Sequence, residues 1–78
     1  MERKKLSELK NGEKGRILSL NGDADFCRKL RSMGIAENVP VRYVFESPFG
    51  DPAAYESQGL LIAVRRRDGA LIEVEPWD

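Results

Sequence analysis

The residues able to carry chemistry are few in this chain, which has a single cysteine, Cys27, and no histidine. A lone thiol without an imidazole lacks the general base that usually activates it. Cys27 also falls on the apolar stripe of a predicted helix, so a small core residue is the favoured interpretation. Histidine is the commonest general base at neutral pH, and its absence argues against an enzyme.

Phosphate and metal chemistry also lack their usual sequence patterns. The seven glycines form neither Gly-x-x-x-x-Gly-Lys-Ser/Thr nor Gly-x-Gly-x-x-Gly, which argues against nucleotide hydrolysis. Asp51, in Gly-Asp-Pro, offers a carboxylate to a metal ion, but aspartate before proline in a turn more often bonds its own backbone. We therefore expect no catalytic residue, no metal site and no cofactor.

The charges of the chain are balanced, with 13 lysines and arginines against 13 aspartates and glutamates. A net charge of zero gives no general attraction to nucleic acid or anionic lipid. The densest cationic run is Arg65-Arg66-Arg67, predicted at a strand end, where solvated arginines are the favoured interpretation. Partner binding comes next, and nucleic-acid binding follows because few aromatic residues are available for stacking.

The length and the N-terminal residues bound the domain organisation. With 78 residues, the chain has room for one domain, 1–78, with one modest core. No apolar run follows the opening Met-Glu-Arg-Lys-Lys, and one cysteine cannot form an internal disulfide. We therefore expect a reduced, cytoplasmic protein.

One helix is predicted, beginning near Asp23 and ending near Met33, and the rest of the chain is expected to form a sheet around it. Asp23 can accept hydrogen bonds from the first free N–H groups, and Gly34 favours a Schellman ending in which Ile35 packs back on Leu30. The residues at helical spacing on the buried face are Phe26, Cys27, Leu30, Met33 and Gly34.

The remaining chain has the pattern of short strands, predicted at 15–20, 39–47, 54–57 and 60–66 and in a last strand around Ile72 and Val74. In the first, Leu18 and Leu20 share a face. A helical turn with Leu6 and Leu9 covers the core, and 48–52 is a loop. About five strands with one inserted helix indicate a mainly β fold, a small, partly open antiparallel barrel of the SH3-like type. The helix closes one end, and Trp77 covers the other end or packs on the terminal strand.

The last two strands are predicted to form a hairpin around Arg67-Asp68-Gly69. A three-residue loop, with its glycine in the left-handed conformation, sets Val64 against Ile72, whereas a two-residue loop would set Val64 against Glu73. The first register keeps apolar residues together and is preferred. It places four further residues on the outer face: Leu61, Ala63, Arg65 and Leu71.

Two features are predicted to contact a protein partner. One is the outer-face group Leu61, Ala63, Arg65 and Leu71, and the other is Phe49, at the tip of a loop stiffened by two prolines. Aromatic and arginine anchors dominate interface energies, and a stiff loop loses less entropy on binding. The alternative is that a twisted barrel buries these residues. The next candidate contact is the exposed helix face with Arg28, Lys29 and Arg31.

A series of short motifs runs along almost the whole chain. In order they are Leu-Ser-Glu-Leu-Lys-Asn-Gly-Glu-Lys-Gly at 6–15, Leu-Arg-Ser-Met-Gly-Ile at 30–35, Val-Pro-Val at 39–41, Ser-Pro-Phe-Gly-Asp-Pro at 47–52, Gly59, Ile-Ala-Val-Arg at 62–65 and Ala-Leu-Ile-Glu-Val at 70–74. Their order and spacing resemble the ferrous iron transport protein A family, FeoA. Two departures are small: Asn38 stands where that family usually has glycine, and Ile-Ala-Val-Arg replaces Leu-Ala-Leu-Arg.

This resemblance implies an SH3-like accessory protein that binds and modulates the FeoB ferrous iron transporter through the transporter's cytoplasmic GTP-binding domain. The chain would then meet the membrane only through the transporter, and we expect a monomer without a nucleic-acid partner. Two alternatives stay open. One is a free-standing relative of the SH3-like domain of iron-dependent repressors of the diphtheria toxin repressor type, here without DNA-binding helices. The other is a small barrel that binds single-stranded nucleic acid.

The composition yields a first prediction, about metal. The purified protein should not bind ferrous iron tightly, because it has no histidine, one thiol predicted to be buried, and scattered carboxylates. Titration calorimetry under anaerobic conditions checks this. Stoichiometric binding at submicromolar concentration would contradict it.

Overall fold

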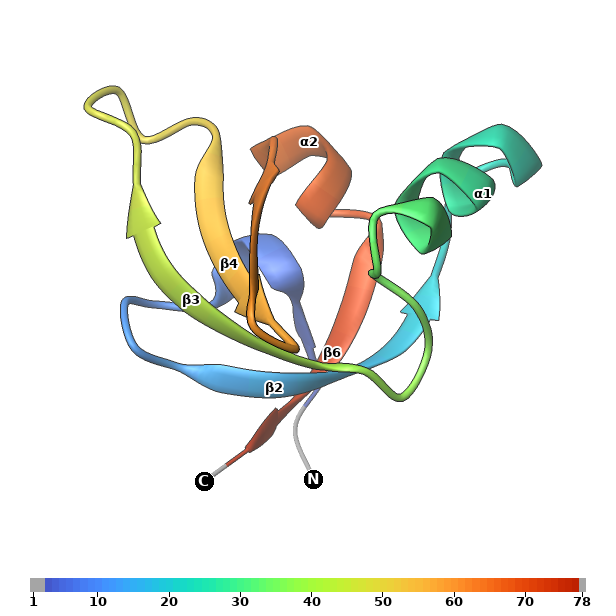
Figure 1. The fold of residues 1–78 in the computed structure, drawn as a ribbon, viewed down its shortest axis with the longest axis horizontal. Coiled ribbons are helices and arrows are strands. Elements are labelled where there is room, and N and C mark those ends of the chain that lie inside the picture. Colours follow the sequence, from blue (N-terminus) through green and yellow to red (C-terminus); the bar gives the residue numbers. More distant parts are fainter. Residues whose placement is uncertain (1–2, 78) are drawn as a thin grey trace.

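The computed structural model describes residues 3–77, which form a strongly curved sheet with helices at its openings (Figure 1). All strand pairs are antiparallel, and the spatial order is β1-β6-β2-β3-β4-β5, so β1 and β5 are the edges. The predicted mainly β, partly open barrel is confirmed, with a short extra strand at the N-terminus. The strands are β1 (Lys4–Lys5), β2 (Lys14–Leu20), β3 (Pro40–Glu46), β4 (Ala53–Ser57), β5 (Leu60–Val64) and β6 (Ile72–Trp77).

Three short helices accompany the sheet: η1 (Leu6–Glu8), a 3-10 turn, α1 (Ala24–Ser32) and α2 (Arg66–Gly69). The predicted turn at the N-terminus is η1, and the predicted helix is α1. The second α-helix was not predicted. Within residues 3–77, no helix has the length and apolar character needed to cross a bilayer.

The ends of α1 are set by the residues that the sequence indicated. At its start, the Asp23 side chain accepts a hydrogen bond from the Phe26 N–H at 2.8 Å. At its end, Gly34 has φ of 97°, and the Ile35 N–H donates to the Leu30 carbonyl at 2.9 Å. This is the 6→1 bond of a Schellman motif, which satisfies a carbonyl that the last turn leaves free.

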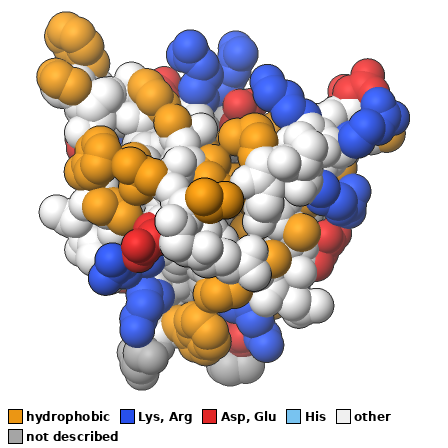
Figure 2. Space-filling view, viewed as in Figure 1, with side chains coloured by type: hydrophobic (Ala, Val, Ile, Leu, Met, Phe, Trp, Pro, Cys, Tyr) orange, Lys and Arg blue, Asp and Glu red, His pale blue; other side chains and the backbone are white. Residues whose placement is uncertain are grey.

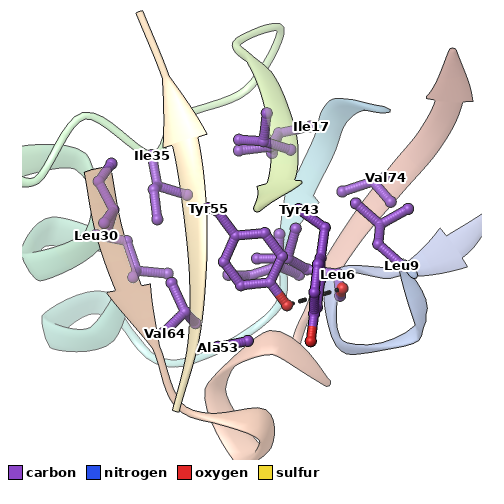
Figure 3. Packing of buried hydrophobic residues seen from close by; sticks show 13 residues of the cluster. Leu6, Leu9, Ile17, Leu30, Ile35, Tyr43, Ala53, Tyr55, Val64 and Val74 are labelled. Carbon is purple, nitrogen blue, oxygen red and sulfur yellow. Dashed lines mark hydrogen bonds between the residues drawn. The ribbon is translucent and has the colours of Figure 1, made fainter. Parts of the chain in front are cut away.

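The core lies inside the curve of the sheet and beneath η1 (Figure 3). Of α1, one side chain is fully part of it, Leu30, while Phe26 and Met33 are partly buried against it. The helix therefore closes one end of the barrel, and the expectation that the sheet wraps around the helix is wrong. The largest fully buried side chains come from the strands and short turns: Leu6, Ile17, Ile35, Ile72 and Val74.

Two β-bulges change the faces that the sequence predicted for β2 and β3. The register of β2 on β6 shifts at Leu18, so Ile17 and Leu20 both pack toward the core, although strict alternation placed them on opposite faces. The register of β3 on β4 shifts at Val44. Phe45 thereby leaves the buried face of its strand and is 51% exposed.

The predicted hairpin of the last two strands is wrong. Residues Arg66–Gly69 form α2 instead, β5 pairs with β4, and β6 pairs with β2 and β1. Gly69 does not have the positive φ of a left-handed turn; it allows close packing, because a Cβ there would lie 3.1 Å from the backbone nitrogen of Ser7. The apolar pattern correctly marked Val64 and Ile72 as buried, but such a pattern fits any antiparallel neighbour.

Two buried tyrosines link the sheet to η1. The Tyr55 hydroxyl donates to the Leu6 carbonyl at 3.2 Å, and its ring meets that of Tyr43 edge-on at 5.4 Å between centroids (Figure 3). Burial raises the pKa of Tyr55 to about 12, and the neighbouring Tyr43 adds to the increase. The phenol therefore stays protonated in the folded protein where it would ionise in an unfolded chain.

This difference predicts a loss of stability at alkaline pH. Below pH 10 both states hold the Tyr55 proton, but between about pH 10 and pH 12 the unfolded chain releases it more readily, so the free energy of unfolding falls as pH rises. In Tyr55→Phe that decline should be shallower. Urea unfolding at pH 9 to 12 measures it, roughly spanning both pKa values. Equal slopes in both proteins would contradict the assignment to Tyr55.

Candidate functional site

The outer face of β3, β4 and β5 carries a row of apolar side chains. The strand register sets Phe45 opposite Ala54, and Ala54 opposite Ala63. Because the alternate residues Ala53 and Tyr55 belong to the core, Ala54 lies on the outer side of β4, where it is covered and only 6% exposed, whereas Phe45 and Ala63 are exposed. Leu61 lies two residues before Ala63 on the same face and is 59% exposed. We call Phe45, Ala54, Leu61 and Ala63 the outer apolar face.

Phe49 extends this surface beyond the sheet. It lies in the loop between β3 and β4 and is 96% exposed. Figure 2 shows hydrophobic side chains over the tip of this loop, at the upper left, and below it on the left side of the molecule. Contiguous exposed apolar side chains on a small domain often mark a protein contact, so this side of the barrel is the candidate binding surface.

The Phe49 loop is fastened to α2 by Arg66. The Arg66 backbone N–H donates to the Asp51 carboxylate at 2.9 Å, and the Arg66 Nε donates to the Gly50 carbonyl at 2.8 Å. Asp51 thus accepts from an N–H at the start of α2. The sequence had suggested a bond to the backbone of its own turn instead. These bonds hold the loop in one position and reduce the entropy that Phe49 would lose on binding.

A second chain of polar contacts connects this fastening to the core. The buried Tyr43 donates through its hydroxyl to Glu46 Oε1 at 2.7 Å, and the same oxygen lies 3.9 Å from an Arg66 guanidinium nitrogen. The hydrogen bond to Glu46, followed by burial, raises the pKa of Tyr43, so its hydroxyl remains a donor at neutral pH. The base of the loop is therefore anchored from both β3 and α2.

Of the five predicted contact residues, the structure places Leu61 and Ala63 together on the outer face of β5. Phe49 lies in the loop before β4, at the Ala53–Val64 end of the β4–β5 pair, whereas Leu61 is near the other end, by the Gln58-Gly59 turn. Arg65 is exposed directly after β5, as the residue before α2. Whether these residues bind a partner stays a prediction.

Leu71 and Phe45 differ from the sequence prediction. Leu71 was grouped with β5 through the hairpin, but it follows α2, and its carbonyl accepts from the Asn21 N–H at 2.8 Å. No strand pairing in residues 3–77 joins it to β5. The exposure of Phe45 was not predicted, because strict alternation of inward and outward residues does not reveal the bulge at Val44. The apolar Val44, which breaks the alternation, was the available sign of a bulge.

Two hollows flank these elements. A shallow one of about 360 Å³ lies beside Trp77. This residue belongs to the terminal strand β6, pairs with Lys14 of β2 and is 50% exposed, so its expected packing on the terminal strand or over the end of the barrel stays a prediction. Another, of about 270 Å³, lies between α1 and β5. Neither is lined by a group of side chains with an evident catalytic arrangement.

Metal ligands do not gather anywhere in residues 3–77, where no group of three or more histidine, cysteine, aspartate or glutamate side chains could hold an ion. The Cys27 thiol is half-buried and lies 3.6 Å from the Leu20 carbonyl oxygen. The expectation of weak or no iron binding stays a prediction for calorimetry.

Comparison with known proteins gives consistent relatives. The profile of the FeoA domain matches residues 4–76. A fusion of Fe(2+) transport protein A with the Fe(2+) transporter FeoB, from Porphyromonas gingivalis, is 32% identical over 71 residues, which cover 91% of this chain but 8% of that protein. The solution structure of a FeoA protein from Chlorobium tepidum is 28% identical with a TM-score of 0.89, covering 96% of this chain and 71% of that one.

The same fold occurs outside iron transport. A manganese-dependent transcriptional repressor superposes with a TM-score of 0.85 over 96% of this chain and 42% of the repressor chain. The two sequences are 16% identical, so this likeness shows the fold alone.

The fastening of the loop predicts a local effect of Arg66→Ala. Two loop amides report on it, since the Gly50 N–H donates to Ser47 and the Ser47 N–H donates to Pro52. Loss of one charged hydrogen bond should speed their hydrogen exchange about tenfold while the melting temperature changes little. Arg67→Ala is the matched control, because its side chain is 84% exposed. Unchanged exchange in Arg66→Ala would show that the loop is rigid without it.

Proposed function

This chain belongs to the FeoA family, and on that premise we propose that it serves ferrous iron transport by binding and modulating the cytoplasmic GTP-binding domain of a FeoB-type transporter. The fusion relative supports this most directly, because one polypeptide there carries both a FeoA-like part and the transporter. Fusion holds two modules at high effective concentration. Two separate chains lack this covalent link, so they need a binding interface to work together.

This chain spans 8% of the length of that fusion protein, so the transporter's own activity is not assigned to it, and the transporter is proposed as its partner. The role is proposed as binding rather than catalysis, since the FeoA domain is a small accessory domain. A cytoplasmic location follows from the location of the partner domain.

The outer apolar face together with Phe49 is the proposed contact surface. It offers an exposed aromatic side chain on a fastened loop and, farther along the outer face, the exposed aliphatic Leu61 on the edge strand β5. Arg65, at the end of β5, adds a cation at the rim. An apolar centre with a charged rim is the usual composition of a protein interface.

A second candidate function is that of a repressor-type SH3-like module, since the manganese-dependent repressor shares the fold, although not a function that the likeness could show. The described residues form one barrel and leave no pair of helices for the major groove. Binding of single-stranded nucleic acid is the third candidate. Nucleic-acid binding measured at moderate salt, in parallel with a pull-down of the transporter domain, distinguishes all three.

The contact surface yields a prediction with a matched pair of leucines. Phe49→Ala and Leu61→Ser should each weaken binding of the transporter's GTP-binding domain by more than tenfold, about 1.4 kcal/mol, without unfolding the barrel. Leu71→Ser removes the same side chain from a residue that is 40% exposed outside this face, and it should bind as the parent does. Calorimetry with the isolated domain measures the three affinities.

The opposite pattern locates the contact elsewhere. If Phe49→Ala and Leu61→Ser are folded and bind as tightly as the parent, the outer apolar face is not the interface. The exposed face of α1, with Arg28, Lys29 and Arg31, is then tested next.

A further inference from the structure

The hollow between α1 and β5 differs in chemistry from the outer apolar face. Its volume is about 270 Å³, its apolar wall comes from both elements, and its charged residues come from α1, α2 and the segment between β5 and α2. We call it the α1–β5 groove. Its apolar residues are Phe26, Leu30, Met33, Ala63 and Val64, and its charged residues are Lys29, Arg65, Arg67 and Asp68.

The groove exists because the barrel does not close. β5 pairs with β4 alone among the strands of residues 3–77, while β6 turns back to pair with β2 and β1 (Figure 1). The gap at the end of the sheet is bordered by α1 and α2. Phe26 is held at its side of the gap by close packing on Gly22, where a Cβ would collide with the ring.

The groove is bounded by a strand edge with free backbone groups. The two-residue turn at Gln58 and Gly59, both with positive φ, makes Ser57 and Leu60 a hydrogen-bonded pair. By alternation, the N–H and C=O groups of Leu61 and Ala63 then point away from β4, toward the open edge. Such an edge can accept another extended chain as an added strand.

The charges around the groove are unbalanced. Three cations, Lys29, Arg65 and Arg67, face one anion, Asp68, which leaves a net charge of +2. Arg67 lies 3.9 Å from Asp68, with its side chain 84% exposed. Lys29 and Arg65 form no ion pair with any other described residue. The charges of Lys29 and Arg65 are therefore available to an acidic ligand.

We propose that the α1–β5 groove binds an acidic, extended segment of a partner protein, which pairs with the edge of β5. The segment sets one apolar side chain against Leu30 and Val64, and its carboxylates lie beside Lys29 and Arg65. The groove shares Ala63 with the outer apolar face and Arg65 with its rim, but its other lining residues come from α1, α2 and the inner side of β5. The proposal holds for any partner that presents such a segment.

The size and lining of the groove favour a peptide over other anions. Sites for small molecules usually enclose about 300–1,000 Å³, so the groove is small for a drug-sized ligand and suits a single side chain. A single-stranded nucleic acid would pair with the cations, but it has no peptide groups to hydrogen-bond with the strand edge, and its bases need exposed aromatic side chains for stacking. Phe26, the aromatic residue of this groove, is partly buried against the core.

The test uses the complete chain and a synthetic peptide of alternating glutamate and aliphatic residues. Amide NMR titration should show saturable shifts at Ala63, Val64 and the facing turns of α1, with a Kd below about 1 mM. The affinity should fall as salt is added, because exposed charges are screened. The same peptide with lysine for glutamate, and a short oligothymidine, are the comparison probes.

Two matched pairs of variants separate charge from strand pairing. Lys29→Glu should weaken binding of the acidic peptide about fivefold or more. Arg28→Glu, at the preceding residue of α1, should not. Ala63→Pro removes an N–H at the open edge and should weaken it at least about tenfold, whereas Ala63→Val keeps that N–H and should bind. Thermal unfolding confirms that each variant is folded, and the lysine pair remains decisive if Ala63→Pro is not.

The proposal is overturned if the acidic peptide does not bind with a Kd below about 1 mM, or if the lysine peptide binds as tightly. It is also overturned if oligothymidine binds and the acidic peptide does not, or if Lys29→Glu and Arg28→Glu weaken the acidic peptide equally. Since the transporter domain is absent from these titrations, their failure leaves the Phe49 contact standing. Conversely, if the transporter domain does not bind through the outer apolar face and Phe49, the result of the peptide titration is unaffected.

Discussion

The close packing of α2 against η1 is the constraint on which the rest of the barrel depends. Gly69 lies so near the backbone of Ser7 that a Cβ would be 3.1 Å from its nitrogen, and this approach places α2 where a hairpin turn would otherwise stand. With α2 in that position, the chain enters β6 between β1 and β2 instead of beside β5. The sheet is thereby closed on its N-terminal side by β1 and β6, and the β5 edge stays unpaired in residues 3–77.

The same short helix organises the candidate binding surface. Arg66, its first residue, bonds both Asp51 and Gly50, so the Phe49 loop is tied to the element that also packs on η1. The loop is also linked to the core, because the buried Tyr43 donates a hydrogen bond to Glu46 at the base of the loop. A side chain as exposed as Phe49 would ordinarily lie on a mobile loop; here the polar contacts at the base of the loop restrain it.

The edge of β5 separates two surfaces of different chemistry. Its side chains Leu61 and Ala63 belong to the outer apolar face, and Ala63 together with Val64 also lines the cationic α1–β5 groove. Both surfaces are proposed contact sites of a chain that belongs to the FeoA family of ferrous iron transport. The likeness to a repressor chain shows that the fold alone does not specify which partner is bound.

The sequence by itself determined the local elements. The caps of α1 were readable because Asp23 and Gly34 act on backbone groups within a few residues, and the strand faces of Val64 and Ile72 were readable from alternation. Only the tertiary structure decided which strands pair, since apolar alternation is equally satisfied by any antiparallel neighbour. The bulges that expose Phe45, the helix that separates Leu71 from β5 and the charged groove beside Lys29 all depend on contacts distant in sequence. Local periodicity carries no information about such contacts.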